Sequence, residues 1–107
     1  MPTRGNHRAP VLLPQQKKIL EQMGYQIRMA RVRRKISVQL VAERAGVSRQ
    51  SVWAVEKGSP SVVMGTYVKV LHAIGFDKDL LKVCADDPVG RFLQDERDDI
   101  YKRSEER

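Results

Sequence analysis

The stretch that most restricts how this chain can fold is SVQLVAERAGVSRQSVWAVEKG, at residues 37–58. Ser37 and Ser48 each precede a short segment, and a serine in that position caps a helix by accepting a hydrogen bond from its first turn. Gly46 and Gly58 follow the two segments, and glycine ends helices because it adopts a left-handed conformation at little steric cost. The pattern therefore predicts two short helices in close succession.

These two helices are predicted over 38–45 and about 49–57. Apolar residues recur on one side of each, which gives each helix an inward face. Two helices joined by a turn of three or four residues that contains glycine meet at a fixed angle. The inward residues are expected to be Val41, Ala42 and Ala45, then Val52 and Val55, with Val47 filling the corner.

A longer helix is predicted before this stretch, over about 15–35. Pro14 suits a first helical turn, and apolar residues recur at helical spacing as far as Ala30. Gly24 lies inside this helix and marks either a close helix contact or a break into two helices. Residues 1–14 are expected to form a flexible N-terminal arm.

Two further helices are predicted after Gly58. The first spans about 63–74, and its inward residues are expected to be Val63, Tyr67, Val70, Leu71 and Ile74. Asp77 is expected to cap the second, a short helix that contains Leu80, Leu81 and Cys84. Cys84 is expected to be a small core residue there, not a nucleophile.

A last helix is predicted to begin at Asp87 and Pro88, a cap followed by a first-turn proline. The apolar residues on one of its faces are Val89, Phe92 and Leu93. Phe76, Leu80, Leu81, Phe92 and Leu93 are expected to contribute to a dimer, unless Phe92 and Leu93 simply close the core of the monomer. The charged residues 95–107 are expected to fray.

No segment shows the alternation of a strand, so the predicted fold class is all-α, a bundle of five or six helices. The predicted organisation is the arm over 1–14, a helix-turn-helix domain over 15–75, and C-terminal helices over 76–107 that contact a dimer mate or another partner and end in a charged tail.

Charge is distributed unevenly along the chain. Residues 1–75 hold 13 Lys and Arg against three acidic residues, a net charge of +10, whereas residues 76–107 hold seven against ten, a net charge of −3. A basic part and an acidic part favour two surfaces with different partners. A basic face that is merely solvated would have the same composition.

The sequence lacks the features of membrane-spanning, disulfide-bonded, metal-binding and phosphate-loop proteins. No apolar run approaches the roughly 20 residues of a membrane span. The single cysteine excludes an internal disulfide and is typical of a cytoplasmic protein. His7 and His72 lack neighbouring ligands at metal-binding spacing, and no glycine-rich phosphate loop is present. We therefore expect a cytoplasmic protein without enzymatic activity, metal or cofactor.

Half of the chain, about residues 25–75, resembles the helix-turn-helix of Cro and the phage repressors, the XRE family. The matching positions are Arg31, Ser37, Ala42, Ala45 to Ser48, Glu56 to Gly58 and Leu71 to Gly75. The resemblance implies a repressor that binds double-stranded DNA at a palindromic operator as a homodimer. It also implies a partly buried ion pair between Arg31 and Glu56.

In this motif the second helix enters the major groove N-terminus first. Arg49 suits guanine and Gln50 suits adenine. Trp53 either faces DNA or packs over the long helix predicted at about 15–35. The cluster at 33–35 is either a phosphate contact or a helix end favoured by the helix dipole. The predicted DNA-binding residues are Ser37, Val38, Ser48, Arg49, Gln50, Ser51, Trp53, Ala54 and Lys57.

Two shorter segments, 58–66 and 85–91, resemble HipB-like antitoxin repressors, a group that typically pairs with a HipA-like kinase toxin. The resemblance implies that the chain is the antitoxin of such a system. The alternative is a protein-interaction module that mainly holds and inhibits a partner enzyme, with DNA binding secondary. Such a module has no need for residues 49–51 displayed beyond a helix cap.

Overall fold

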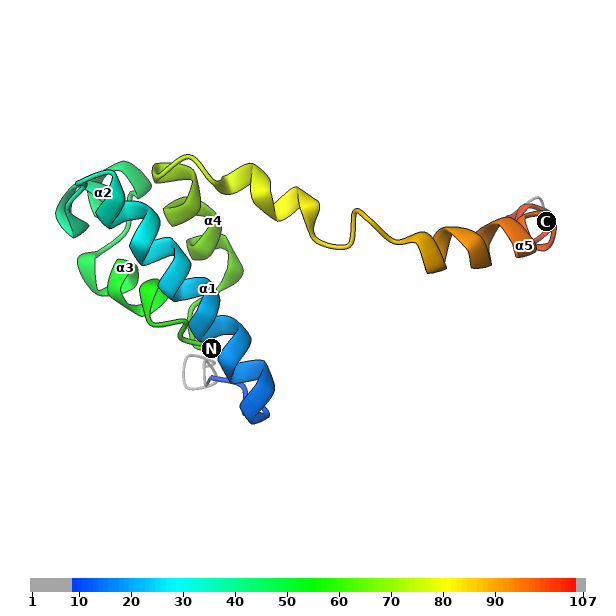
Figure 1. Cartoon of the computed structure of the whole chain (residues 1–107), viewed down its shortest axis with the longest axis horizontal. Coiled ribbons are helices and arrows are strands. Elements are labelled where there is room, and N and C mark those ends of the chain that lie inside the picture. Colours follow the sequence, from blue (N-terminus) through cyan, green and yellow to red (C-terminus); the bar gives the residue numbers. More distant parts are fainter. Residues whose placement is uncertain (1–8, 106–107) are drawn as a thin grey trace, which may run out of the picture.

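The computed structural model describes residues 9–105, and side chains as far as Asp98. In this range every regular element is helical, so the predicted all-α fold is confirmed (Figure 1). Residues 1–8, which make up most of the predicted arm, and 106–107 lie outside the described residues. The elements are α1 (Pro14–Arg33), α2 (Val38–Ala45), α3 (Arg49–Glu56), α4 (Met64–Ala73), the 3₁₀ helix η2 (Asp77–Lys82) and α5 (Pro88–Glu105).

The ends of α2 and α3 follow from the local sequence. Ser37 Oγ accepts a hydrogen bond from the Leu40 amide at 3.0 Å, and Ser48 Oγ accepts one from the Ser51 amide at 3.1 Å. Gly46 ends α2 in the left-handed region, at φ 69°. The two caps and the glycine stop therefore act as predicted, because each depends only on residues a few positions away.

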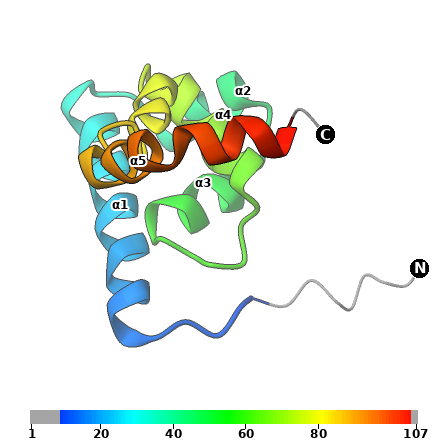
Figure 2. The ribbon, with the colours of Figure 1, turned by 90° about the vertical axis from the view of Figure 1, so that its right-hand side faces the viewer.

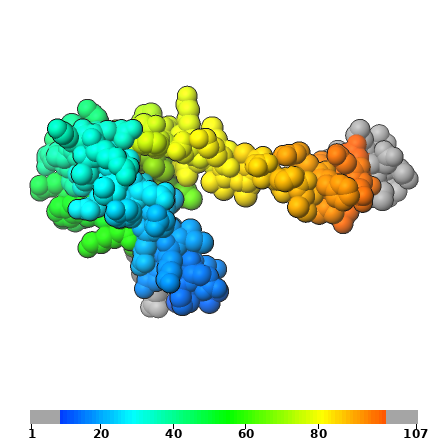
Figure 3. Space-filling view, viewed as in Figure 1, coloured from blue at the N-terminus to red at the C-terminus, as the bar shows by residue number. Residues whose placement is uncertain are grey.

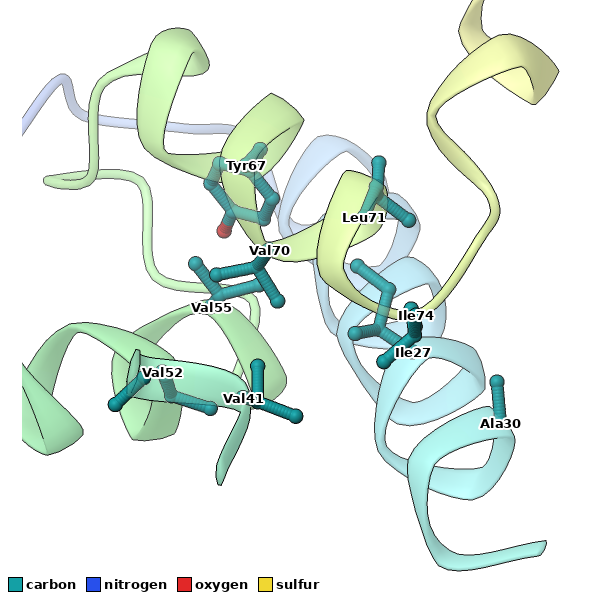
Figure 4. Close-up of a cluster of buried hydrophobic side chains, with 10 residues drawn as sticks. Ile27, Ala30, Val41, Val52, Val55, Tyr67, Val70, Leu71 and Ile74 are labelled. Atoms are coloured by element: carbon teal, nitrogen blue, oxygen red, sulfur yellow. The ribbon is translucent and has the colours of Figure 1, made fainter. Parts of the chain in front are cut away.

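The helices α1 to α4 enclose one aliphatic core (Figure 4). The side chains of Val41, Val52 and Val55 are completely buried there. Tyr67 is also buried, and its hydroxyl donates a hydrogen bond to the Ser59 carbonyl at 2.9 Å. Burial also raises the pKa of the Tyr67 hydroxyl above its usual value. The core joins α3 to both α2 and α4.

Gly24 marks a close contact, and α1 is continuous through it. A Cβ atom at Gly24 would lie 2.6 Å from both the Glu56 carbonyl oxygen and the Gly58 nitrogen. The backbone of α1 therefore touches the backbone at the end of α3, which only a residue without a side chain permits. This contact places α3 beside α1 (Figure 2).

Three predictions at and after α4 are wrong. Val63 is exposed, because it precedes the helix as its N-cap and points away from the core. Phe76, not Asp77, is the cap of η2, and Asp77 lies inside the 3₁₀ helix with its Oδ2 3.0 Å from His72 Nδ1. This hydrogen bond lowers the pKa of Asp77. Cys84 is not in the short helix, which ends at Lys82, and it is exposed, with φ 60°. Leu81 is exposed too.

The last helix, α5, extends away from the other helices (Figures 1 and 3). The radius of gyration is 18.6 Å, against about 13 Å for a compact chain of this length. The charged residues from Asp95, expected to fray, belong to α5 as far as Glu105, and their fraying stays a prediction. Asp87 caps it by accepting a hydrogen bond from the Gly90 amide at 3.0 Å, and Pro88 opens its first turn.

The apolar face of α5 does not close the core of the monomer. Val89, Phe92 and Leu93 are 67%, 59% and 43% exposed. This excludes closure of the monomer core by Phe92 and Leu93 and leaves their face open to a partner. Phe76 and Leu80, also expected in the dimer, are instead partly buried against the core of the monomer.

Candidate nucleic-acid interface

The turn between α2 and α3 consists of Gly46, Val47 and Ser48. The Val47 amide donates a hydrogen bond to the Ala42 carbonyl at 3.0 Å, which closes the turn. The Val47 side chain packs against the edge of the core. Because both the backbone and the corner side chain are held, α3 leaves α2 in a defined direction.

The two faces of α3 differ sharply in exposure. At about 100° per residue, Val52, Val55 and Glu56 share one side, and all three are buried. The other side carries Gln50, Trp53 and Lys57, which are all exposed. Arg49 precedes Glu56 by seven residues and so lies on nearly the same side as Glu56, but in the first turn of α3 it is exposed as well. Trp53 keeps 47% of its surface accessible, so a large aromatic side chain lies on the outward face of α3. The helix is thus anchored by one side and free to contact a partner with the other.

The first turn of α3 is polar and accessible. Ser48 Oγ lies 3.1 Å from Ser51 Oγ in addition to capping the helix, so these two hydroxyls hold the start of α3 together. The first amide groups of a helix lack partners within the helix and attract anions such as phosphate. The neighbouring Arg49 adds a full positive charge to this end of the helix.

The remaining predicted contacts lie at the edges of this surface. Ser37 is exposed at the start of α2, whereas Val38 is half-buried and packs against the core. Ala54 is half-buried on the side of α3. The part that these residues and those on the outward face of α3 play in DNA contact stays a prediction.

The predicted ion pair between Arg31 and Glu56 is present. Arg31 Nε donates to Glu56 Oε2 at 2.6 Å, and Nη2 donates to Oε1 at 3.2 Å. The side chains are 13% and 5% exposed. Arg31 Nη1 also donates to the Ile36 carbonyl at 2.9 Å. One guanidinium therefore ties α1 and the loop before α2 to the last residue of α3, which holds the outward face of α3 in position.

Within the basic cluster at residues 33–35, Arg34 makes two contacts with other parts of the same chain. Its Nη1 donates to the Ala30 carbonyl at 3.0 Å, and its guanidinium lies 4.8 Å from the centre of the Phe76 ring. It therefore closes the end of α1 and packs against the residue before η2, although Arg34 is exposed, as Arg33 and Lys35 are. Sequence reasoning missed the contact with Phe76, because no local signal joins residues 42 positions apart.

The described residues were also compared with the requirements of a metal site and of a membrane-spanning helix. No three His, Cys, Asp or Glu side chains come together in that part of the chain in a way that would hold a metal ion. None of its helices combines the length and the apolar character needed to cross a membrane.

Comparison with known proteins agrees with this geometry. A family model described as a helix-turn-helix domain matches residues 22–83, more than half of the chain. The match runs from the middle of α1 to just past η2, so it includes α2, the turn and α3, and it leaves α5 outside. Searches of curated proteins and of solved structures gave no match.

Proposed function

We propose, from the fact that this chain belongs to the helix-turn-helix domain family, that it is a sequence-specific DNA-binding repressor of the XRE, phage-repressor type. The family alone indicates a DNA-binding regulator. The observation that carries the proposal further is α3, which displays Arg49 and Gln50 in its first turn and Trp53 on its outward face, while its inward face is anchored in the core. Two copies on a palindrome would place their α3 helices about 34 Å apart, one turn of DNA.

The proposed contacts with DNA are of two kinds, contacts to bases and contacts to phosphates. Arg49 reaches guanine O6 and N7 with two hydrogen bonds, and Gln50 pairs in the same way with adenine N6 and N7. The start of α3, with Ser48 and Ser51, faces phosphate, as the positive end of a helix dipole favours. The net charge of +10 over residues 1–75 supports binding through the release of counterions, which makes the affinity strongly dependent on salt.

Arg49→Ala should weaken binding to the cognate operator by about 1–3 kcal/mol and relax discrimination at one base pair in each half-site. The measurement is a set of gel shifts at several salt concentrations, on DNA from upstream of the chain's own gene and on random DNA. The matched control is Arg28→Ala, which removes the same charge from an exposed position on α1. An equal loss on both DNAs would make Arg49 a phosphate contact only, with Gln50 as the better candidate for reading bases.

The chain would further be the antitoxin of a HipA-like kinase toxin. This part of the proposal is supported by the resemblance of residues 58–66 and 85–91 to HipB-like repressors and by the net charge of −3 after residue 75. In such a pair, the basic domain holds DNA and the acidic C-terminal part holds the kinase.

Co-expression with a HipA-like kinase encoded beside the gene should yield a complex in a pull-down. Neutralising an exposed carboxylate of α5, with Asp95→Asn, should weaken capture, and raised salt should act in the same direction. The control is Glu43→Gln on α2, which changes an exposed carboxylate outside the acidic part. If the wild-type chain captures no kinase, the antitoxin role is wrong while the DNA-binding role stands.

The alternative function is a protein-interaction module whose main task is to hold a partner enzyme. The exposed apolar face of α5 favours it, since such a face requires some partner. Absence of a gel shift even at low salt, together with a stable complex with an enzyme, would select this alternative.

A further inference from the structure

We propose that α5 of one copy docks in an apolar groove of a second copy, between α1, α4 and η2, and that the two copies exchange these helices reciprocally. The inference rests on the proposed dimeric repressor and specifies its interface. It joins two features of the chain that the monomer leaves open, a groove without an occupant and a helix without a partner.

The groove has a volume of about 380 Å³ and lies on the face of α1 next to η2. Apolar side chains form most of its wall, chiefly Met23, Ile27, Leu71, Ile74, Phe76 and Leu80. Arg33 and Asp79 provide charged groups in its lining. Its size is in the lower part of the range for pockets that take a ligand, so it suits one or two large side chains.

The helix that fits this groove is α5. Val89, Phe92 and Leu93 are spaced i, i+3 and i+4, so they form one stripe, and all three are exposed. A single helix that stands apart from the body is marginally stable in water without a surface to pack against. The stripe therefore needs an apolar surface of about its own length.

The charges of Glu96 and Arg33 favour one direction of α5 in the groove. Glu96 follows Val89 by seven residues and so continues the stripe at its C-terminal end. Arg33 lies at the groove, on the strongly basic α1. Docking the stripe in the groove with Glu96 beside Arg33 brings opposite charges together, whereas the reverse direction of α5 moves Glu96 away from this cation.

A second copy is favoured over the same chain because α5 points away from its own groove (Figures 1 and 3). Only residues 83–87 join η2 to α5, and Val83 itself forms part of the groove wall. Reciprocal exchange fills both grooves at once and produces a two-fold axis. A palindromic operator requires this symmetry.

The first test measures the oligomeric state by sedimentation, without DNA, at micromolar concentration. The wild-type chain should be a dimer, Phe92→Ala should be a monomer of unchanged helical content, and Leu81→Ala should remain a dimer. Leu81 is the matched control, because it is 78% exposed, apolar and outside the groove. A monomeric wild type, or a dimeric Phe92→Ala, would overturn the proposal.

The second test exchanges the charges between chains. Glu96→Arg and Arg33→Glu should each dissociate at least tenfold more readily than the wild type, because like charges meet at both sites. An equimolar mixture of the two variants should form a heterodimer of nearly wild-type affinity, since every site then pairs Arg with Glu. Failure of the mixture to recover, with recovery in the double variant alone, would mean that α5 docks on its own chain and would refute the exchange.

Two other outcomes separate this inference from the proposed function. If Phe92→Ala loses capture of the kinase but sediments like the wild type, the kinase and not a second copy covers the stripe, and the exchange is wrong. If the mixture of charge variants restores the dimer but no variant or wild-type chain shifts operator DNA, the exchange stands and the proposed repressor does not.

Discussion

Glu56→Ala should lower the free energy of unfolding by about 3–5 kcal/mol, the cost typical of removing one partner of a buried ion pair. The carboxylate accepts hydrogen bonds from both Nε and Nη2 of Arg31, and both side chains are largely buried. Without it the guanidinium stays between α1 and α3 with only the Ile36 carbonyl as partner. A small domain has about 5–15 kcal/mol of stability in total, so the variant should be close to unfolding at 37 °C.

Urea denaturation measures this loss, and Glu43→Ala is the control. Glu43 is an exposed glutamate on α2 that accepts a hydrogen bond from Gln39 Nε2, so its removal should change stability by less than about 0.5 kcal/mol. Removing both charges, with Arg31→Met and Glu56→Leu together, should cost less than Glu56→Ala alone. An unchanged denaturation midpoint for Glu56→Ala would contradict the role assigned to the pair.

Gly58→Ala should be the second large effect, with a loss of about 2–5 kcal/mol. Gly58 has φ 71°, where a side chain costs about 1–2 kcal/mol. Its Cβ would also lie 2.7 Å from Glu21 Cα and would meet the backbone of Leu20. Backbone cannot rotate aside as a side chain can, so α1 and the end of α3 would have to separate, at a further cost of about 1–3 kcal/mol.

Gly46→Ala separates the cost of the left-handed conformation from the cost of the contact with the backbone of α1. Gly46 has nearly the same conformation, φ 69°, but a Cβ there would have no neighbour within 4 Å. This variant should therefore lose only the conformational part, about 1–2 kcal/mol. Equal losses in the two variants, measured by thermal and urea unfolding, would show that the close approach of α1 is of no energetic importance. Because α1 positions α3, Gly58→Ala should also weaken binding to operator DNA more than Gly46→Ala does.

The sequence by itself determined the parts of this protein that depend on near neighbours. The capping serines at 37 and 48 and the stop at Gly46 act within one helical turn, so α2, the turn and α3 could be located to within a residue. The inward face of α3 and the opposite, outward face with Gln50 followed from helical spacing, and the exposed position of Arg49 followed from its place directly after the capping Ser48. The Arg31–Glu56 pair came from the family resemblance.

Only the tertiary structure decided what lies far apart in the chain. From the sequence alone, Gly24 could equally break α1 into two helices. Only the structure shows that Gly24 instead lets the backbone of α1 touch the end of α3. Cys84 and Leu81 recur like core residues, but the surface that would bury them is absent where η2 turns outward. The stripe on α5 has the same spacing as a core helix, yet it stands free of the body. Periodicity specifies which side of a helix is apolar. The surface against which that side packs depends on the path of the whole chain.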